Sequence, residues 1–177
     1  MATWKQCGYE MYCKLLDEAV KEMQGMDVVE EVDTQIDINV TAYIPDTYIE
    51  NINQKIEVYQ DIANIDNEDR ILDMTDELID RYGEIPNECV NLLEVARIKT
   101  YARALKVLSI KQKGQNIVVQ FSNEECIMDK VQILIDLYKG DVMFSSGVSP
   151  YITLKLQSEK DSDILNSVLK LLKIVKG

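Results

Sequence analysis

The sequence predicts an α+β fold, in which one antiparallel sheet has helices packed on one side and is preceded by an isolated amphipathic helix. Three observations support this prediction. Residues 35–44 alternate between polar and apolar side chains, a pattern typical of a half-buried strand. Apolar side chains recur at helical spacing through residues 52–104. After residue 106, a hairpin pattern followed by a helix pattern occurs twice in outline.

The N-terminal region predicts two short segments ahead of the main domain. Residues 9–24 place six apolar side chains on one helical stripe, and Gly25 follows as a common helix end. The next residues are acidic and lack turn residues, so we interpret them as a connector. The rest of the chain is long enough for one ordinary hydrophobic core. The predicted organisation is a terminal helix at 1–25, a connector at 26–33 and a main domain at 34–177.

The middle of the chain predicts a helical region with a sharp corner. Asp66 and Asp69 resemble a cap at the start of its second helix, and Gly83 supplies a left-handed stop. Pro86 suits the first turn of the next helix, because its fixed backbone angle fits there and its missing N–H would be unpaired anyway. The predicted helices are 52–63, about 67–82 and 86–104. The predicted inner face of the second helix is Ile71, Leu72, Leu78, Ile79 and Tyr82.

The C-terminal half contains the two hairpin–helix patterns. In the first, Gly114 joins two strands, and Ser122 with Glu125 forms a capping box that opens a helix ending near Tyr138. In the second, a loop of Ser, Gly and Pro joins two strands ahead of the last helix. The predicted strands are 107–111, 116–121, 142–144 and 151–156, and the last helix is 160–175.

The composition excludes several kinds of active site. The chain has no His, which removes Ser-His-Asp triads, Cys-His dyads and His metal sites. Its four cysteines form no Cys-x-x-Cys pair, so we expect reduced, mostly buried thiols and no metal site. The chain has no glycine-rich phosphate loop, so we expect no cofactor in it. We therefore predict a chain that is not an enzyme and has no catalytic residues.

Charge and hydropathy restrict the partners. No apolar run is long enough to span a membrane and the N-terminus lacks a signal-peptide pattern, so we expect a cytoplasmic protein that binds no membrane. A net charge of −12 argues against nucleic-acid binding by the chain as a whole. Residues 22–94 hold twenty Asp and Glu against three Lys and Arg, whereas residues 95–123 hold six Lys and Arg and no acid. The two regions therefore meet partners, or each other, with opposite charge.

Three acidic residues share one face of the second predicted helix: Asp73, Glu77 and Asp80. One interpretation is a solvated helix face with mild repulsion between neighbouring carboxylates. A second is a docking face for arginines of another domain, because carboxylates on a rigid helix receive bidentate guanidinium hydrogen bonds. A catalytic pair of acids is the least favoured of the three, since nothing in the sequence marks these side chains as desolvated.

The basic run also allows two interpretations. It contains Arg97, Lys99, Arg103, Lys106, Lys111 and Lys113. It could contact phosphates or an acidic partner, which would make the chain a module that contacts DNA or RNA polymerase. Alternatively, it balances the acidic half within the molecule. The sequence favours the second interpretation, because Tyr101 is the only aromatic residue inside the run that could stack on a base.

Three linked motifs resemble one protein family. They are Ala-Tyr-Ile-Pro-Asp-Thr-Tyr-Ile at 42–49, Lys-Ile-Glu-Val-Tyr at 55–59, and Glu-Leu-Ile-Asp-Arg-Tyr-Gly at 77–83, which continues through Pro86 to Asn-Leu-Leu-Glu-Val-Ala-Arg-Ile-Lys at 91–99. In this order they closely resemble the C-terminal domain of the bacterial transcription-repair coupling factor, Mfd. The resemblance covers about residues 32–121. Residues 8–20 are similar to the family segment that ends the translocase motor.

The resemblance implies an autoinhibitory, regulatory module. In this family the full-length protein is a DNA translocase, driven by ATP and Mg, that displaces stalled RNA polymerase and recruits UvrA for nucleotide excision repair. Its C-terminal domain clamps the N-terminal UvrB-like module, which masks the UvrA-binding surface and restrains the motor. By motif matching, the clamp contacts fall on Glu77 and Asp80, with Asp73 as a further candidate. The resemblance also implies that residues 1–25 end the motor and that DNA is bound by the motor rather than by this domain.

Overall fold

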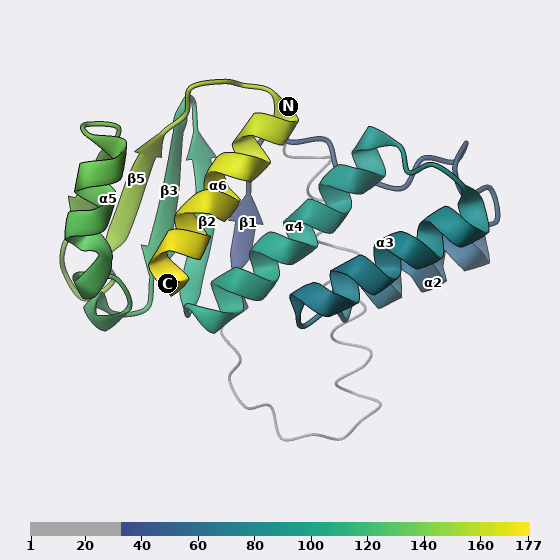
Figure 1. Ribbon diagram of the computed structural model, residues 1–177, viewed down its shortest axis with the longest axis horizontal. Coiled ribbons are helices and arrows are strands. Elements are labelled where there is room, and N and C mark those ends of the chain that lie inside the picture. Colours follow the sequence, from purple (N-terminus) through teal and green to yellow (C-terminus); the bar gives the residue numbers. More distant parts are fainter. Residues whose placement is uncertain (1–32) are drawn as a thin grey trace, which may run out of the picture. The chain divides into compact units, whose positions relative to one another are not determined.

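The computed structural model describes residues 33–177 (Figure 1). These residues form two compact units. Residues 41–100 form a helical unit. Residues 33–40 and 101–177 form a second unit that contains the sheet. The helix predicted at 9–24 and nearly all of the connector lie outside the described residues, so these segments and their boundaries stay predictions.

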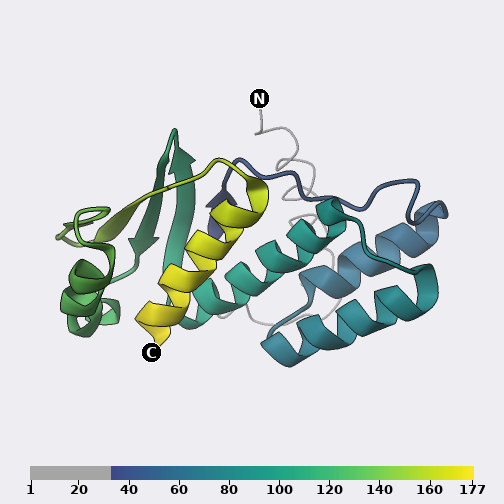
Figure 2. The same cartoon turned by 45° about the horizontal axis from the view of Figure 1, so that its top comes forward.

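The helical unit is built from α2 (Ile52–Ala63), α3 (Glu68–Tyr82) and α4 (Asn87–Ala104), as Figures 1 and 2 show. The last turn of α4 belongs to the second unit. Each of the three predicted helices is therefore confirmed, with ends that differ by a residue at most.

The two ends of α3 follow from local chemistry. Asn67 caps its start, because the backbone of Asn67 is extended and its side-chain oxygen accepts a hydrogen bond of 3.0 Å from the Arg70 N–H. The sequence prediction placed this cap one residue early, at Asp66, which instead accepts a hydrogen bond from the Asn67 side-chain amide at 2.8 Å. At the other end, Gly83 ends the helix as predicted, but its φ of +85° and ψ of −158° lie in a glycine-only extended region rather than in the predicted left-handed helical one.

A narrow stripe of α3 is buried. It consists of Ile71, Met74 and Leu78. The prediction also assigned Leu72 and Ile79 to the inner face, but these side chains are 57% and 48% exposed. Each lies about 100° around the helix from a buried neighbour, and a narrow contact stripe does not reach that far. Most of the circumference of α3 is therefore open to solvent.

The opposite holds for α4, which is buried around most of its circumference. Its buried side chains include Cys89, Leu92, Leu93, Val95, Ala96 and Ile98. Several of its polar side chains, among them Asn91, Glu94 and Arg97, are half-buried rather than exposed. α4 therefore supplies much of the apolar interior of the helical unit.

The second unit contains a five-stranded sheet with the order β1-β2-β3-β5-β4. Its strands are β1 (Gln35–Asp37), β2 (Val107–Lys113), β3 (Asn116–Phe121), β4 (Val142–Ser145) and β5 (Tyr151–Lys155). The pairs β2–β3, β3–β5 and β4–β5 are antiparallel, which confirms both predicted hairpins. The fold is α+β, as predicted.

The first strand corrects the prediction in two respects. β1 pairs with β2 in parallel, so the sheet is mixed rather than purely antiparallel. The whole helical region separates these strands, and a connection of that length permits the crossover that parallel pairing needs. The strand is also shorter than the predicted 35–44, because the Val40 N–H donates to the Ile38 carbonyl in a tight turn that leaves the ladder.

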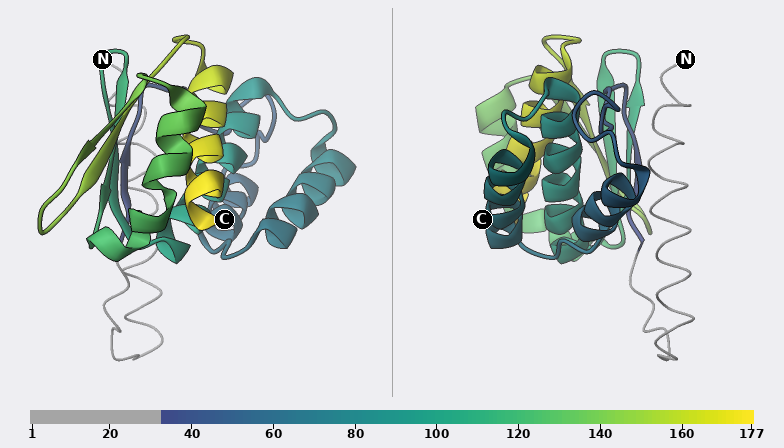
Figure 3. Two further views of the ribbon diagram at one scale, coloured as in Figure 1. Left: turned by 60° about the vertical axis from the view of Figure 1, so that its left-hand side comes forward. Right: turned by 90° about the vertical axis from the view of Figure 1, so that its right-hand side faces the viewer.

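Two helices cover one side of the sheet (Figure 3). They are α5 (Val131–Tyr138) and α6 (Asp161–Lys176). The buried residues of α6 are Ile164, Leu165, Val168, Leu169, Leu171, Leu172 and Val175. The buried sheet residues include Ile117, Val119, Ile152 and Leu154. Helices on one side of the sheet are therefore confirmed for this unit.

The predicted capping box at Ser122 and Glu125 is wrong. Two short 3-10 turns, Glu124–Cys126 and Met128–Lys130, occupy this segment, and α5 begins only at Val131. The Ser122 hydroxyl is buried and has no hydrogen-bond partner within residues 33–177, so it does not cap a helix. The nearby Glu124 side chain accepts a hydrogen bond of 3.0 Å from the Gly147 N–H.

Candidate protein-binding site

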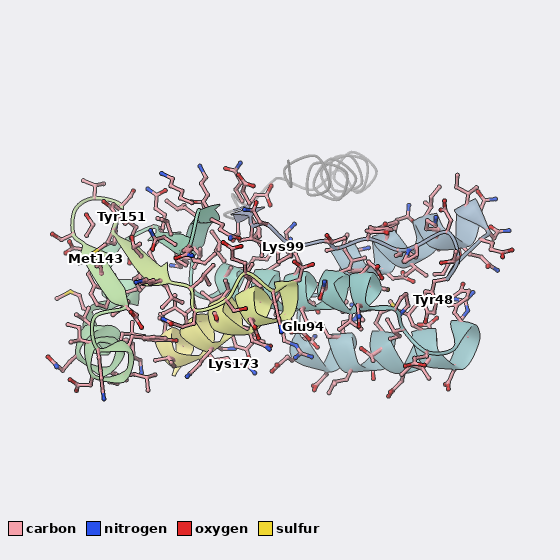
Figure 4. The ribbon with its side chains drawn as sticks, turned by 90° about the horizontal axis from the view of Figure 1, so that it is seen from above. Tyr48, Glu94, Lys99, Met143, Tyr151 and Lys173 are labelled. Atoms are coloured by element: carbon pink, nitrogen blue, oxygen red, sulfur yellow. The ribbon has the colours of Figure 1, made fainter. Side chains whose placement is uncertain are left out.

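The corner between α3 and α4 is held by Tyr48 (Figure 4). Its hydroxyl lies 3.1 Å from the carbonyl oxygen of Leu78 and 3.0 Å from that of Gly83. Its ring packs against Tyr82 with 5.8 Å between centroids, and the guanidinium of Arg81 lies 5.1 Å from the centre of the Tyr82 ring. Burial raises the pKa of Tyr48, so its hydroxyl stays protonated and can donate to these carbonyls.

The first two motifs are also joined by direct contacts. The Ile44 N–H donates a hydrogen bond of 2.8 Å to the Tyr59 hydroxyl, and Lys55 forms an ion pair with Asp46. The side chain of Asn91 then donates to the carbonyl of Thr41 at 2.9 Å. The residues of the three motifs thus build a frame that fixes the direction of α3.

The three predicted acidic residues lie on the exposed surface of α3. Asp73, Glu77 and Asp80 are separated by four and three residues, so they share one face over about 10 Å of helix. Glu77 forms an ion pair of 3.4 Å with Arg81, whose side chain is 43% exposed against 50% for Glu77. Such an exposed pair is weak. Within residues 33–177, Asp73 and Asp80 form no ion pair, so the structure leaves both carboxylates available to a partner.

Two acidic residues of α2, Asp61 and Glu57, also contribute to the electrostatics of this surface, and neither was predicted from the sequence. Burial raises the pKa of Asp61 on α2, and the charges of Glu77 and Glu57 raise it further, while Arg70 and Arg81 act in the opposite direction. Asp61 on α2 therefore interacts electrostatically with Glu77 on α3. Only the tertiary structure brings Asp61 close to Glu77, because these two residues are sixteen positions apart in the sequence.

The basic run is divided between the two units. Arg97 is 21% exposed and lies 3.3 Å from Glu94 and 3.7 Å from Glu68, so its charge is balanced within the helical unit. Lys99 is half-buried in the same unit, whereas Arg103 and Lys106 belong to the second unit.

Tyr101, the aromatic residue within the run, is contacted by two lysines of α6. The ammonium groups of Lys176 and Lys173 lie 4.9 and 5.9 Å from its centroid. These contacts compete with stacking of a base on the ring. Balance within the molecule is thus supported at Arg97, and the use of the remaining basic residues stays a prediction.

Metal clusters, membrane-spanning helices and reactive thiols are the remaining candidate features. Residues 33–177 contain no group of three or more Cys, Asp or Glu side chains arranged to hold a metal ion. In the same range, no helix combines the length and the apolar character needed to cross a membrane. Burial raises the pKa of the Cys89 thiol to about 12, with a smaller contribution from Glu88, so this thiol is unreactive at neutral pH. Cys7 and Cys13 lie outside the described residues.

Comparison with known proteins places these motifs in a family. The family model described as the TRCF domain matches residues 38–131, which is more than half of the chain. The chain is 37% identical over 119 residues to the transcription-repair-coupling factor of Staphylococcus haemolyticus (strain JCSC1435), covering 66% of this chain and 10% of that protein. It is 38% identical over 117 residues to the transcription-repair-coupling factor of Staphylococcus aureus (strain USA300), covering 65% of this chain and 10% of that protein. The chain thus spans about a tenth of the length of these relatives.

A solved structure gives the same result. The crystal structure of the C-terminal domain of transcription-repair coupling factor matches with a TM-score of 0.70 and 27% sequence identity. The match covers 81% of this chain and 92% of that chain. The range matched by the family model, residues 38–131, contains Tyr48, Tyr59 and Gly83, which hold the frame of the helical unit. From its motifs, its fold and these matches, the chain belongs to the TRCF domain family of transcription-repair coupling factors.

Proposed function

We propose that this domain acts as an interdomain clamp, in which the acidic face of α3 binds arginines of the N-terminal UvrB-like module of the same protein. The observation that carries the proposal is the row of exposed carboxylates on one face of α3, Asp73, Glu77 and Asp80. Two of them form no ion pair within residues 33–177. The matching family, with its transcription-repair coupling factors, supports the placement of this face in a multidomain protein.

The physical basis is preorganisation. α3 is anchored along Ile71, Met74 and Leu78, so the backbone that carries the carboxylates is already ordered before a partner arrives. Guanidinium groups bind carboxylates with two parallel hydrogen bonds, and these charge-assisted bonds are stronger than neutral ones. A guanidinium placed near Glu77 would also relieve its repulsion with Asp61. The surface therefore favours a cationic, arginine-bearing partner.

In the proposed mechanism the clamp closes the full-length protein. The closed form masks the UvrA-binding surface of the N-terminal module and restrains the ATP-driven motor. Engagement of RNA polymerase releases the clamp and exposes that surface to UvrA. Couplings of this kind are worth about 1–3 kcal/mol. Reversal of a single carboxylate charge would thus shift the closed population by about tenfold.

The test is a binding experiment between this chain and the separately made N-terminal module. We expect the double variant Glu77→Lys and Asp80→Lys to lose most of the affinity, measured by isothermal titration calorimetry at low and moderate salt. The matched control is Glu125→Lys with Glu159→Lys, which changes the charge equally at exposed positions of the second unit. Unchanged binding by the α3 variant, or an equal loss in the control, would overturn the assignment of this face.

A further inference from the structure

A basic strip runs along the C-terminal half of α6. Lys170, Lys173 and Lys176 are exposed and follow one another at intervals of three residues, a rise of about 4.5 Å per step. The ammonium of Lys170 lies 5.8 Å from the ring centre of Tyr138, and that of Lys176 lies 4.9 Å from the ring centre of Tyr101. The two rings therefore hold cationic groups at either side of the helix.

The surface beside this strip has a shallow hollow that is largely open to solvent. The hollow has a volume of about 440 Å³ and is lined by Asn166, Leu169, Lys170, Lys173 and Ile174. Leu169 is buried and Ile174 half-buried, whereas Asn166 and the two lysines are exposed. We call these five residues the α6 basic pocket. Its apolar floor, Leu169 and Ile174, and its cationic rim, Lys170 and Lys173, differ in charge and chemistry from the acidic face of α3. Figure 4 labels Lys173 on α6.

We propose that the α6 basic pocket binds an acidic amphipathic helix of another protein. One apolar side chain of that helix would enter the hollow above Leu169 and Ile174, and carboxylates about one turn to either side would pair with Lys170 and Lys173. The carboxylates of such a helix are complementary in charge to the lysines of the pocket. An apolar anchor with a polar rim is also a common form of protein interface. Helix-dipole stabilisation acts on Lys173 and Lys176 in the last turn, whereas Lys170 lies one turn earlier, beside the Tyr138 ring.

A nucleic acid fits this surface less well. The rings of Tyr101 and Tyr138 already have lysine ammonium groups beside them, which leaves less room for stacked bases. The chain as a whole carries a net charge of −12, which opposes binding of a long polyanion. A short acidic helix carries less charge and requires only local complementarity.

The experiment uses the whole chain and a labelled, helix-stabilised peptide with a central Leu flanked by Glu one turn away on each side. A second peptide has the same composition with the Leu moved to the opposite face, and a short DNA duplex is the third probe. Binding is followed by fluorescence anisotropy at two salt concentrations. We expect saturable binding of the first peptide, weakened about tenfold by Lys170→Glu with Lys173→Glu. Lys113→Glu with Lys155→Glu, at exposed positions of the sheet, is the matched control and should bind as the original chain does.

Several results would overturn the proposal. They are absence of saturable peptide binding, equal binding of the second peptide, or equal loss in the control variant. Preferential binding of the duplex with the same lysine dependence would assign the pocket to nucleic acid instead. Circular dichroism, with Lys170→Gln and Lys173→Gln as milder substitutions, separates loss of binding from loss of folding. Binding to the N-terminal module should be unchanged by these variants, so this test and that of the clamp fail independently.

Discussion

Replacement of Gly83 by Ala is a direct test of how the α3–α4 corner is built. The φ of +85° and ψ of −158° at Gly83 belong to a region of backbone space that is essentially restricted to glycine. No atom lies within 4 Å of the position that a Cβ would occupy, so steric conflict with neighbours contributes nothing to the cost. The whole effect must therefore come from the backbone, and it should be about 1–3 kcal/mol.

The same substitution at Gly140 is the matched control. A Cβ there also meets nothing within 4 Å, and Gly140 is absent from the glycines with positive φ in residues 33–177. Ala at this position should leave stability unchanged or raise it by about 0.4–1 kcal/mol, because it restricts the unfolded chain. The two variants thus differ in backbone conformation and share the same open surroundings.

The assay is thermal and urea unfolding of the 177-residue chain, followed by far-UV circular dichroism. For a chain of this length a loss of 1–3 kcal/mol lowers the melting temperature by about 2–12 °C. We expect that decrease for Gly83→Ala and none for Gly140→Ala. Equal melting temperatures for the two variants would refute the argument that backbone conformation at Gly83 decides the corner.

Two further predictions concern the surroundings of this corner. Tyr48→Phe removes the hydroxyl that reaches the carbonyls of Leu78 and Gly83 and should cost about 0.5–1.5 kcal/mol in urea unfolding. Tyr43→Phe, at an exposed tyrosine with no side-chain hydrogen bond in residues 33–177, should cost almost nothing, and a similar cost for both would contradict the assigned role. Glu77→Gln should lower the pKa of Asp61 toward its ordinary value of 3.8, as measured by NMR titration of the carboxyl carbon. Because the folded-state pKa of Asp61 is raised, its contribution to stability is largest at low pH and is lost as pH rises through that pKa. An unmoved pKa would show that Glu77 does not act on Asp61.

Local signals in the sequence predicted local structure well. The helices at 52–63, 67–82 and 86–104 were found from apolar spacing, from Gly83 and from Pro86, because caps and stops act within one or two turns. The prediction failed at two places. Two 3-10 turns stand where the capping box at Ser122 and Glu125 was predicted, and the strand predicted at 35–44 ends at Asp37 because the chain turns at Ile38–Val40.

The candidate site shows the same division. The acidic face of α3 could be predicted because Asp73, Glu77 and Asp80 lie within two helical turns of one another, and helix periodicity alone places them together. The roles of Asp61 and Arg97 could not, since their effective neighbours lie on other helices. The α6 basic pocket was also missed: the spacing of its five residues is local, but the burial of Leu169 and the ring contacts of Lys170 and Lys176 depend on packing with other elements.

The sequence by itself determined which segments form the main helices, where the two hairpins lie, the charge of the α3 surface and the family resemblance of the three motifs. These properties depend on residues within about two turns or one hairpin of each other, where periodicity and turn chemistry are sufficient. Only the tertiary structure decided the parallel pairing of β1 with β2, the narrow buried stripe of α3 and the balance of Arg97 by Glu68 and Glu94. Each of these depends on which distant segments pack together, and packing is determined by the burial of the whole core rather than by any single segment.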